Sequence, residues 1–319
     1  MDERQEQEQL ENTAAEKTEA LNGNAPEEAE QAAGGKKKKE KGKKSVGQEI
    51  LSWVLTLLMA VAAALLIRTF IFEPVRVDGH SMDDTLGDGE IMFVSKFDYS
   101  STWLSLPWQS DEDKESASRF TFGGDPSRFD VVICRYPGRG DTNFVKRVIG
   151  LPGDTVSLTE GQLTVNGESY EEAYINNEYR SGRLNELKDY RVPKKGDTFS
   201  VTLENNYYSF QLNGEPWNIV NTTLKCRDAE GKQLTIQDSG TVFSYDGITC
   251  STDNGAELKT LLTELGKKTL TVDEDYFFVM GDHRNNSNDS RSVGPIARNM
   301  IVGHVRCVVF PFNKWRGVQ

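Results

Sequence analysis

The chain has 319 residues, enough for one large domain or two small ones with tails, and a net charge of -12 at pH 7. This acidic balance excludes nucleic acid as the main partner, because phosphate binding needs a basic surface. Neither the four cysteines nor the three histidines show a metal-binding spacing such as C-x-x-C or H-E-x-x-H, so no zinc site is expected.

Residues 1–47 are polar and change in character along their length. Residues 1–34 are rich in Glu, Gln and Ala, and such a segment buries too little apolar surface to offset the entropy of ordering it. Residues 36–44 are mostly lysine. We therefore predict a disordered tail that ends in a basic cluster.

The long apolar segment Ile50–Ile67 has no charged residue, and its length matches a hydrocarbon core of roughly 30 Å. The lysines before it predict a cytoplasmic N-terminus and an outward-facing remainder of the chain. A buried core helix is disfavoured by the neighbouring lysines. A cleaved signal peptide is disfavoured by the long preceding region and by the absence of a small-residue cleavage site. We predict a single-pass signal anchor over residues 48–72.

Short apolar segments punctuated by turns flank the middle of the chain and predict a mainly β fold. The body is expected to be a barrel-like antiparallel sheet formed by residues 73–154 and 273–319. Residues 99–127 are low in periodicity and predict an inserted loop, whose Trp103–Trp108 segment either contacts the membrane interface or packs onto the body. The expected strands cover residues 75–78, 91–96, 130–136, 143–149, 276–280 and 303–310.

Residues 155–272 predict an inserted second domain that is rich in β-structure. Asn-Gly pairs at 166–167 and 213–214 are typical of hairpin turns. Leucines at i, i+3, i+4 and i+7 over residues 258–265 predict one amphipathic helix. Two cysteines, Cys226 and Cys250, fall in this segment, where an extracytoplasmic setting permits a disulfide, and the sequence leaves their pairing open.

Ser81 lies just past the anchor and is either an ordinary loop residue or a nucleophile, which would need a base. Lys146 is a candidate base, because alternation in F-V-K-R-V-I points one of two consecutive cations inward or along a sheet edge. Desolvation would lower the pKa of this lysine from about 10.4, whereas an edge lysine would stay in water. A Ser-His-Asp triad is the other solution. His80 would point away from Ser81 on an extended strand, which leaves only His283 and His304 for that role.

Four motifs in order resemble those of the type I signal peptidases, membrane-anchored Ser-Lys proteases that release exported proteins. Residues 81–86 resemble S-M-x-P-T-L, and residues 128–132 resemble R-G-D-V-V. Residues 144–154 resemble Y-V-K-R-V-I-G-L-P-G-D, and residues 281–291 resemble G-D-N-R-D-N-S-x-D-S-R. The resemblance leaves the tail and the two inserts uncovered.

The resemblance implies a serine endopeptidase that cleaves N-terminal signal peptides from preproteins. Ser81 would be the nucleophile and would offer its main-chain N–H to the oxyanion, while Lys146 would act as general base and then as acid. Ser287 would orient the Lys146 ammonium. A nearby ion pair and two bracing residues of the same loop would support this arrangement, namely Asp289 with Arg291, and Asp282 with Arg284.

The resemblance also implies how the substrate binds and where the protein acts. The substrate would add as a strand beside Val75, Val77 and Asp78. Its small residues would fill shallow pockets lined by Met82, Phe144 and Met280. The implied partners are signal peptides of secreted preproteins, the lipid bilayer and the export machinery. No metal or organic cofactor is required, and the expected location is the cytoplasmic membrane with the catalytic domain outside.

Four positions depart from the family pattern. Gly79 lacks the hydroxyl that some members carry two residues before the nucleophile, so the second oxyanion donor stays open. Asp84 replaces a proline, and His283 and Asn285 replace Asn and Asp. These departures keep an inactive membrane-anchored binding or scaffold protein as an alternative. A Ser-Lys self-cleaving repressor is a second alternative, although no DNA-binding head is visible.

Overall fold

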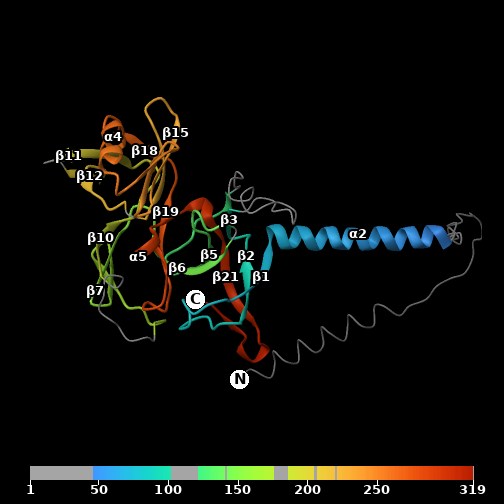
Figure 1. The fold of residues 1–319 in the computed structure, drawn as a ribbon. Helices are drawn as coiled ribbons and strands as arrows, with labels where there is room; N and C mark the ends of the chain where they lie inside the picture. The colour runs from blue at the N-terminus through green and yellow to red at the C-terminus, as the bar shows by residue number, and fades with distance from the viewer. Residues whose placement is uncertain are drawn as a thin grey trace, which may run out of the picture. The chain divides into compact units, whose positions relative to one another are not determined.

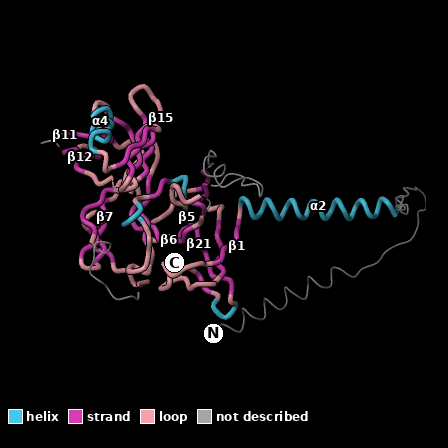
Figure 2. The backbone as a smooth tube through the Cα atoms, viewed as in Figure 1, coloured by secondary structure: helices cyan, strands magenta, loops and turns pink. Residues whose placement is uncertain are grey.

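The computed structural model describes residues 46–101, 121–140, 142–175, 186–204, 207–219 and 221–318. The expected disordered tail, the lysine cluster and the Trp103–Trp108 segment lie outside the described residues. The described chain is mainly β, as the sequence predicts, and contains few helices besides the first one (Figure 2).

The apolar segment forms one continuous helix, α2, which runs from Val46 to Phe70 (Figure 1). Its part from Val46 to Ile67 has 22 residues and contains an 18-residue window with a mean hydropathy of 2.6, so it is long and apolar enough to cross a membrane. The side chains of this part are exposed within the protein, and apolar residues occur on all its sides. A helix of this kind needs an apolar environment around its whole circumference.

The helix ends earlier than the sequence pattern indicates. It ends at Phe70, and Glu73 and Pro74 both lie in strand β1 (Phe72–Arg76). Strand β1 is the end strand of its sheet and pairs with β2 (Ile91–Ser95). A proline is tolerated there because an edge strand has a side on which no ladder hydrogen bond needs its missing N–H.

The sheet that carries the candidate site combines strands from both ends of the body. Its antiparallel order is β1-β2-β21-β5-β6-β19-β20, so C-terminal strands lie between and beside N-terminal ones. Strand β6 (Phe144–Gly150) lies between β5 and β19, inside the sheet. The remaining strands of this sheet are β21 (Ile301–Phe310), β5 (Val131–Cys134), β19 (Tyr276–Met280), β20 (Ile296–Ala297) and β22 (Arg316–Gly317).

Two further sheets come from the middle of the chain. A four-stranded sheet has the order β10-β7-β8-β9, and an eight-stranded one has the order β13-β12-β11-β18-β14-β15-β16-β17. The first contains β7 (Thr155–Thr159), β8 (Gln162–Val165), β9 (Glu168–Tyr170) and β10 (Leu187–Arg191). The second contains β11 (Thr198–Glu204), β12 (Tyr207–Leu212), β13 (Glu215–Pro216), β14 (Thr223–Arg227), β15 (Gln233–Asp238), β16 (Val242–Tyr245), β17 (Ile248–Ser251) and β18 (Leu270–Val272).

Local predictions in this region are confirmed. Both Asn-Gly pairs form hairpin turns, between β8 and β9 and between β12 and β13, and their residues have the positive φ such turns require. Helix α4 (Gly255–Leu265) starts at Asn254, whose side chain accepts from the N–H of Glu257, and it buries the predicted leucine face. Residues 57–319 form one compact unit, and its division into a catalytic and an inserted domain stays a prediction.

The ends of the expected loop at 99–127 are ordered as strands. Strand β3 (Tyr99–Ser101) pairs with β4 (Thr121–Gly123) and closes the base of the insertion. The short helical turns near the C-terminus are α5 (Ser290–Val293), η2 (Arg298–Met300) and η3 (Phe312–Lys314).

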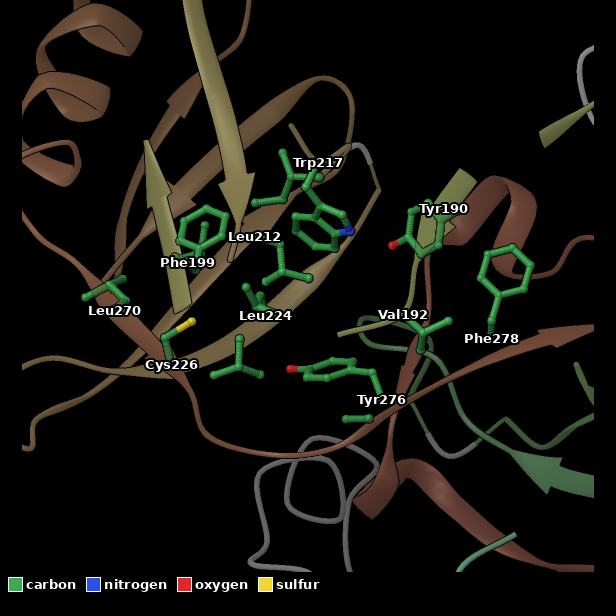
Figure 3. Packing of buried hydrophobic residues seen from close by; sticks show 14 of the residues in the cluster. Tyr190, Val192, Phe199, Leu212, Trp217, Leu224, Cys226, Leu270, Tyr276 and Phe278 are labelled. Carbon is green, nitrogen blue, oxygen red and sulfur yellow. The ribbon is translucent and has the colours of Figure 1, made fainter. Parts of the chain in front are cut away.

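A buried apolar cluster joins the middle segment to strand β19. Tyr190 packs against Phe278 with ring centroids 5.2 Å apart, and Trp217 and Phe199 lie on the other side of Tyr190 (Figure 3). Strand β19, which pairs with β6 and leads into the fourth motif, is thereby packed against a second layer.

The two cysteines of the middle segment are free thiols. Cys226 lies on β14 and Cys250 on β17, and strands β15 and β16 lie between them in the sheet order. Neighbouring strands are about 4.8 Å apart, whereas a disulfide needs Cα atoms within about 7 Å. The disulfide that the sequence left open is therefore not formed.

Candidate active site

Ser81 is held in a tight turn after β1 by two buried neighbours. The N–H groups of Thr85 and Leu86 donate to the carbonyl of Met82, at 2.8 and 2.6 Å. Met82 and Leu86 are buried in the same apolar cluster as Val77. Ser81 itself stays half-buried, and its backbone is fixed by the turn that follows it.

Gly79 has φ +114°, a conformation that L side chains rarely adopt, and its N–H donates to Asp88 Oδ1 at 3.0 Å. A serine at this position would be strained whatever space surrounds it. The turn geometry therefore favours glycine, and residue 79 offers no hydroxyl toward Ser81.

Lys146 contacts Ser81 directly. Its Nζ donates to Ser81 Oγ at 2.7 Å and to the carbonyl of Val145 at 2.9 Å. Lys146 is only 3% exposed, because β6 lies inside the sheet. The alternative of an edge lysine in water is therefore wrong for this chain. The next residue, Arg147, is also fully buried. Both faces of β6 are therefore covered, whereas the sequence pattern predicted that only one of the two cations would point inward.

Burial lowers the pKa of Lys146 from its ordinary value, and the nearby carboxylates of Asp289 and Asp282 partly oppose this shift. Burial also raises the pKa of the Cys134 thiol to about 12, so this thiol is neutral at physiological pH. A lysine with a lowered pKa, hydrogen-bonded to a hydroxyl, can deprotonate that hydroxyl.

Asp289 and Arg291 form the expected ion pair. Arg291 Nη2 lies 2.8 Å from Asp289 Oδ2, and both side chains are buried. Burial alone would raise the pKa of Asp289, but hydrogen bonds from Arg291 outweigh it and lower the pKa. The same carboxylate accepts from the N–H of Gly281 at 2.9 Å. It therefore connects the two ends of the polar loop that follows β19, from Gly281 to Asp289.

Asp282 connects this loop to β6 and to the segment that follows Ser81. It accepts from Arg147 Nε at 2.9 Å and from Arg147 Nη2 at 2.7 Å, and the hydroxyl of Thr85 also donates to it. Sequence reasoning named Asp282 but missed Arg147 and Thr85 as its partners. The sequence did contain a hint of this pairing, because Arg147 belongs to the same motif as Lys146 and Thr85 to the same motif as Ser81.

Ser287 does not make the expected contact with Lys146. Its hydroxyl is buried, and no hydrogen bond joins it to Lys146. It nevertheless lies close to Ser81, because a Cβ added to Gly281 would clash with the Ser287 side chain and would lie 2.5 Å from the Ser81 carbonyl oxygen. The orienting role of Ser287 stays a prediction.

The histidines do not form a triad with Ser81. His283 instead holds the backbone around Ser81: its N–H donates to the Ser81 carbonyl at 3.0 Å, and its Nδ1 lies 3.1 Å from the carbonyl oxygen of His80. The His80 ring faces Asp83 at 3.1 Å, and the His304 ring stacks on Tyr99. In the described part of the chain, the Ser81 hydroxyl bonds only to Lys146.

The predicted substrate-binding residues fall into two groups. Val75 and Asp78 lie in or just after the edge strand β1 and are at least partly accessible, as is Phe144 on β6. The other three, Val77, Met82 and Met280, are buried. Met280 and Met82 belong to different apolar clusters, and their role in lining the substrate pockets stays a prediction.

Comparison with known proteins identifies the family of this chain. The signal peptidase family, peptidase S26, matches residues 50–310. Signal peptidase I P of Bacillus subtilis subsp. natto is 34% identical over 279 residues, which cover 87% of this chain and 97% of the relative. Signal peptidase I of Bacillus amyloliquefaciens is 28% identical over 280 residues, 88% of this chain and 98% of the relative.

A signal peptidase I structure from Enterococcus faecalis V583 covers 57% of this chain and 97% of its own, with 24% identity and a TM-score of 0.26. The family match extends over most of the chain, and the relatives match over nearly their full length. The chain therefore belongs to the type I signal peptidase family of serine endopeptidases.

The pH dependence of activity should report the desolvated lysine. Because only the neutral amine accepts a proton, kcat/KM should rise with pH through the lowered pKa of Lys146, with a midpoint below 10.5. A pH profile of kcat/KM on a peptide substrate measures this. The ascending limb should persist in a His80→Gln/His283→Asn double variant, and its disappearance there would assign it to a histidine instead.

Gly281→Ala should disrupt the site through the backbone. The added methyl would lie 2.5 Å from the Ser81 carbonyl oxygen, and a displacement of the nucleophile by ~1 Å costs about 100-fold in rate. Comparing kcat/KM of the folded variant with wild type tests this. Gly317→Ala, where an added Cβ meets nothing within 4 Å, is the matched control. Wild-type rates in folded Gly281→Ala would contradict the close approach.

Proposed function

We propose that this protein cleaves signal peptides from exported preproteins by a Ser81–Lys146 dyad mechanism. The observation that carries the proposal is the 2.7 Å hydrogen bond between Lys146 Nζ and Ser81 Oγ at a buried lysine. The family supplies the substrate class, because its members are signal peptidases. The intact dyad also favours an active enzyme over the inactive scaffold alternative.

The chemistry follows from the two side chains. Neutral Lys146 accepts the Ser81 proton as Oγ attacks the scissile carbonyl, and the resulting ammonium returns a proton to the leaving amine. Water then hydrolyses the acyl-enzyme, with Lys146 again acting as base. The Ser81 N–H donates to no acceptor within the described ranges, so it is available to the oxyanion, while His283 holds the other end of the Ser81 residue.

The substrate binds as an added strand in this proposal. Strand β1 pairs with β2 on one side, and the other side of β1 ends the sheet order. An extended peptide can pair with such an edge, and the chain continues from this edge into the turn that carries Ser81. The side chains of Val75, Val77 and Asp78 lie along this edge strand and the segment that continues it to the nucleophile.

The membrane organisation is also proposed. Helix α2 anchors the protein in the cytoplasmic membrane, and the lysines before it keep the N-terminus inside. Residues 73–154 with 273–319 form the catalytic domain on the outer side, and residues 155–272 form the insert. The lipid bilayer and the export machinery are the partners that bring the preprotein to the enzyme.

The dyad is tested by substituting each member with a side chain that cannot do its chemistry. Ser81→Ala and Lys146→Met should each lower kcat/KM on a preprotein by at least about 1,000-fold, because members of such a unit are individually essential. Lys267→Met, at an exposed lysine of the same protein, is the matched control. The assay uses the full chain in lipid vesicles, with circular dichroism to verify folding. Substantial activity in either folded dyad variant would refute the mechanism.

A further inference from the structure

The segment after β9 reaches the candidate active-site loop through a buried ion pair. Arg284 donates from Nη1 to Glu172 Oε2 at 2.8 Å, and its Nη2 donates to Glu172 Oε1. The side chains of Glu172 and Arg284 are only 6% and 8% exposed. Two buried charges stay charged only when paired, and the bidentate geometry fixes both groups in direction as well as distance.

A second contact from the same segment holds the residue next to the general base. The ring of Tyr174 lies beneath the Arg147 guanidinium, whose carbon is 3.9 Å from the ring centroid. The Tyr174 hydroxyl donates to Glu172. Burial raises the pKa of Tyr174, so the hydroxyl stays protonated and can keep donating. Glu172 is therefore bonded on one side to the loop and on the other to a residue that packs on β6.

The connection from Glu172 to the nucleophile is short. Arg284 Nε donates to the Gly281 carbonyl at 3.1 Å, and Gly281 packs directly against the Ser81 carbonyl. The loop has asparagine at position 285, where the family pattern has an aspartate. The carboxylate that Arg284 binds thus comes from a segment more than 100 residues earlier in the chain.

We propose that Glu172 is a positioning residue for this reaction: it holds Arg284, and through Arg284 the Gly281 backbone, at the distance from Ser81 that the dyad requires. The inference rests on the proposed Ser81–Lys146 function. It assigns a task to the segment after β9, which lies in none of the four family motifs. Glu172 does not touch the edge strand where substrate is proposed to add, so its effect falls on the rate of the bound complex.

The test compares Glu172→Gln with Glu171→Gln, its exposed neighbour, in the full chain in lipid vesicles. Glu172→Gln should lower kcat about 10- to 100-fold with KM within about twofold of wild type, because loop displacement misaligns Ser81 without removing a substrate contact. Glu171→Gln should match wild type in both constants. Unchanged kcat in Glu172→Gln, or a loss equal to the unfolded fraction seen by circular dichroism, overturns the proposal.

A double-mutant cycle separates positioning from a general loss of stability. If Glu172 acts through Arg284, the Glu172→Gln/Arg284→Gln double variant should be no slower than Arg284→Gln alone. If the two substitutions lowered kcat by the product of their separate effects, Glu172 would not act through Arg284.

Tyr174→Phe removes only the hydroxyl that donates to Glu172, and it is the variant to use if the charge variants do not fold. It should lower kcat at unchanged KM, and an unchanged kcat counts against the proposal. Ser81→Ala in the same series distinguishes the cases, because activity there would mean that the dyad itself is misassigned.

Discussion

The proposed dyad mechanism depends on keeping Lys146 desolvated but free of a carboxylate partner. A buried lysine beside a carboxylate would stay protonated and could not act as a base. Three buried acids lie around the dyad, and each is taken up by an arginine: Asp282 by Arg147, Asp289 by Arg291 and Glu172 by Arg284. Lys146 is left with the Ser81 hydroxyl and one backbone carbonyl as its hydrogen-bond acceptors.

This arrangement is costly for folding and useful for chemistry. Buried ion pairs repay their desolvation only with good geometry, and apolar replacements are often as stable. The three pairs here are nevertheless suited to fixing one loop conformation, since each pair holds its residues at a defined distance from Ser81. They also act as a fixed electrostatic frame, because guanidinium groups stay charged at any physiological pH.

The sequence predicts what depends on local pattern and misses what depends on partners. The helix span, the Asn-Gly hairpins and the leucine face of α4 follow from periodicity and turn chemistry, and the structure confirms them. Alternation in β6 could not decide between an edge and a central strand, because that depends on β19, which lies far along the chain. Glu172 lies in no motif, and its role emerges only when the chain folds back onto the loop.

The order of the two cations on β6 also has a physical reason. Consecutive residues of a strand point to opposite faces, which is how Lys146 reaches Ser81 while Arg147 reaches Asp282. Arginine does not deprotonate in proteins and binds a carboxylate through two parallel bonds, whereas lysine can lose its proton when desolvated. Exchanging the two would leave a permanent cation at the nucleophile and a weaker, titratable partner for the buried acid. The different acid–base chemistry of the two side chains therefore explains why the lysine lies beside Ser81 and the arginine beside Asp282.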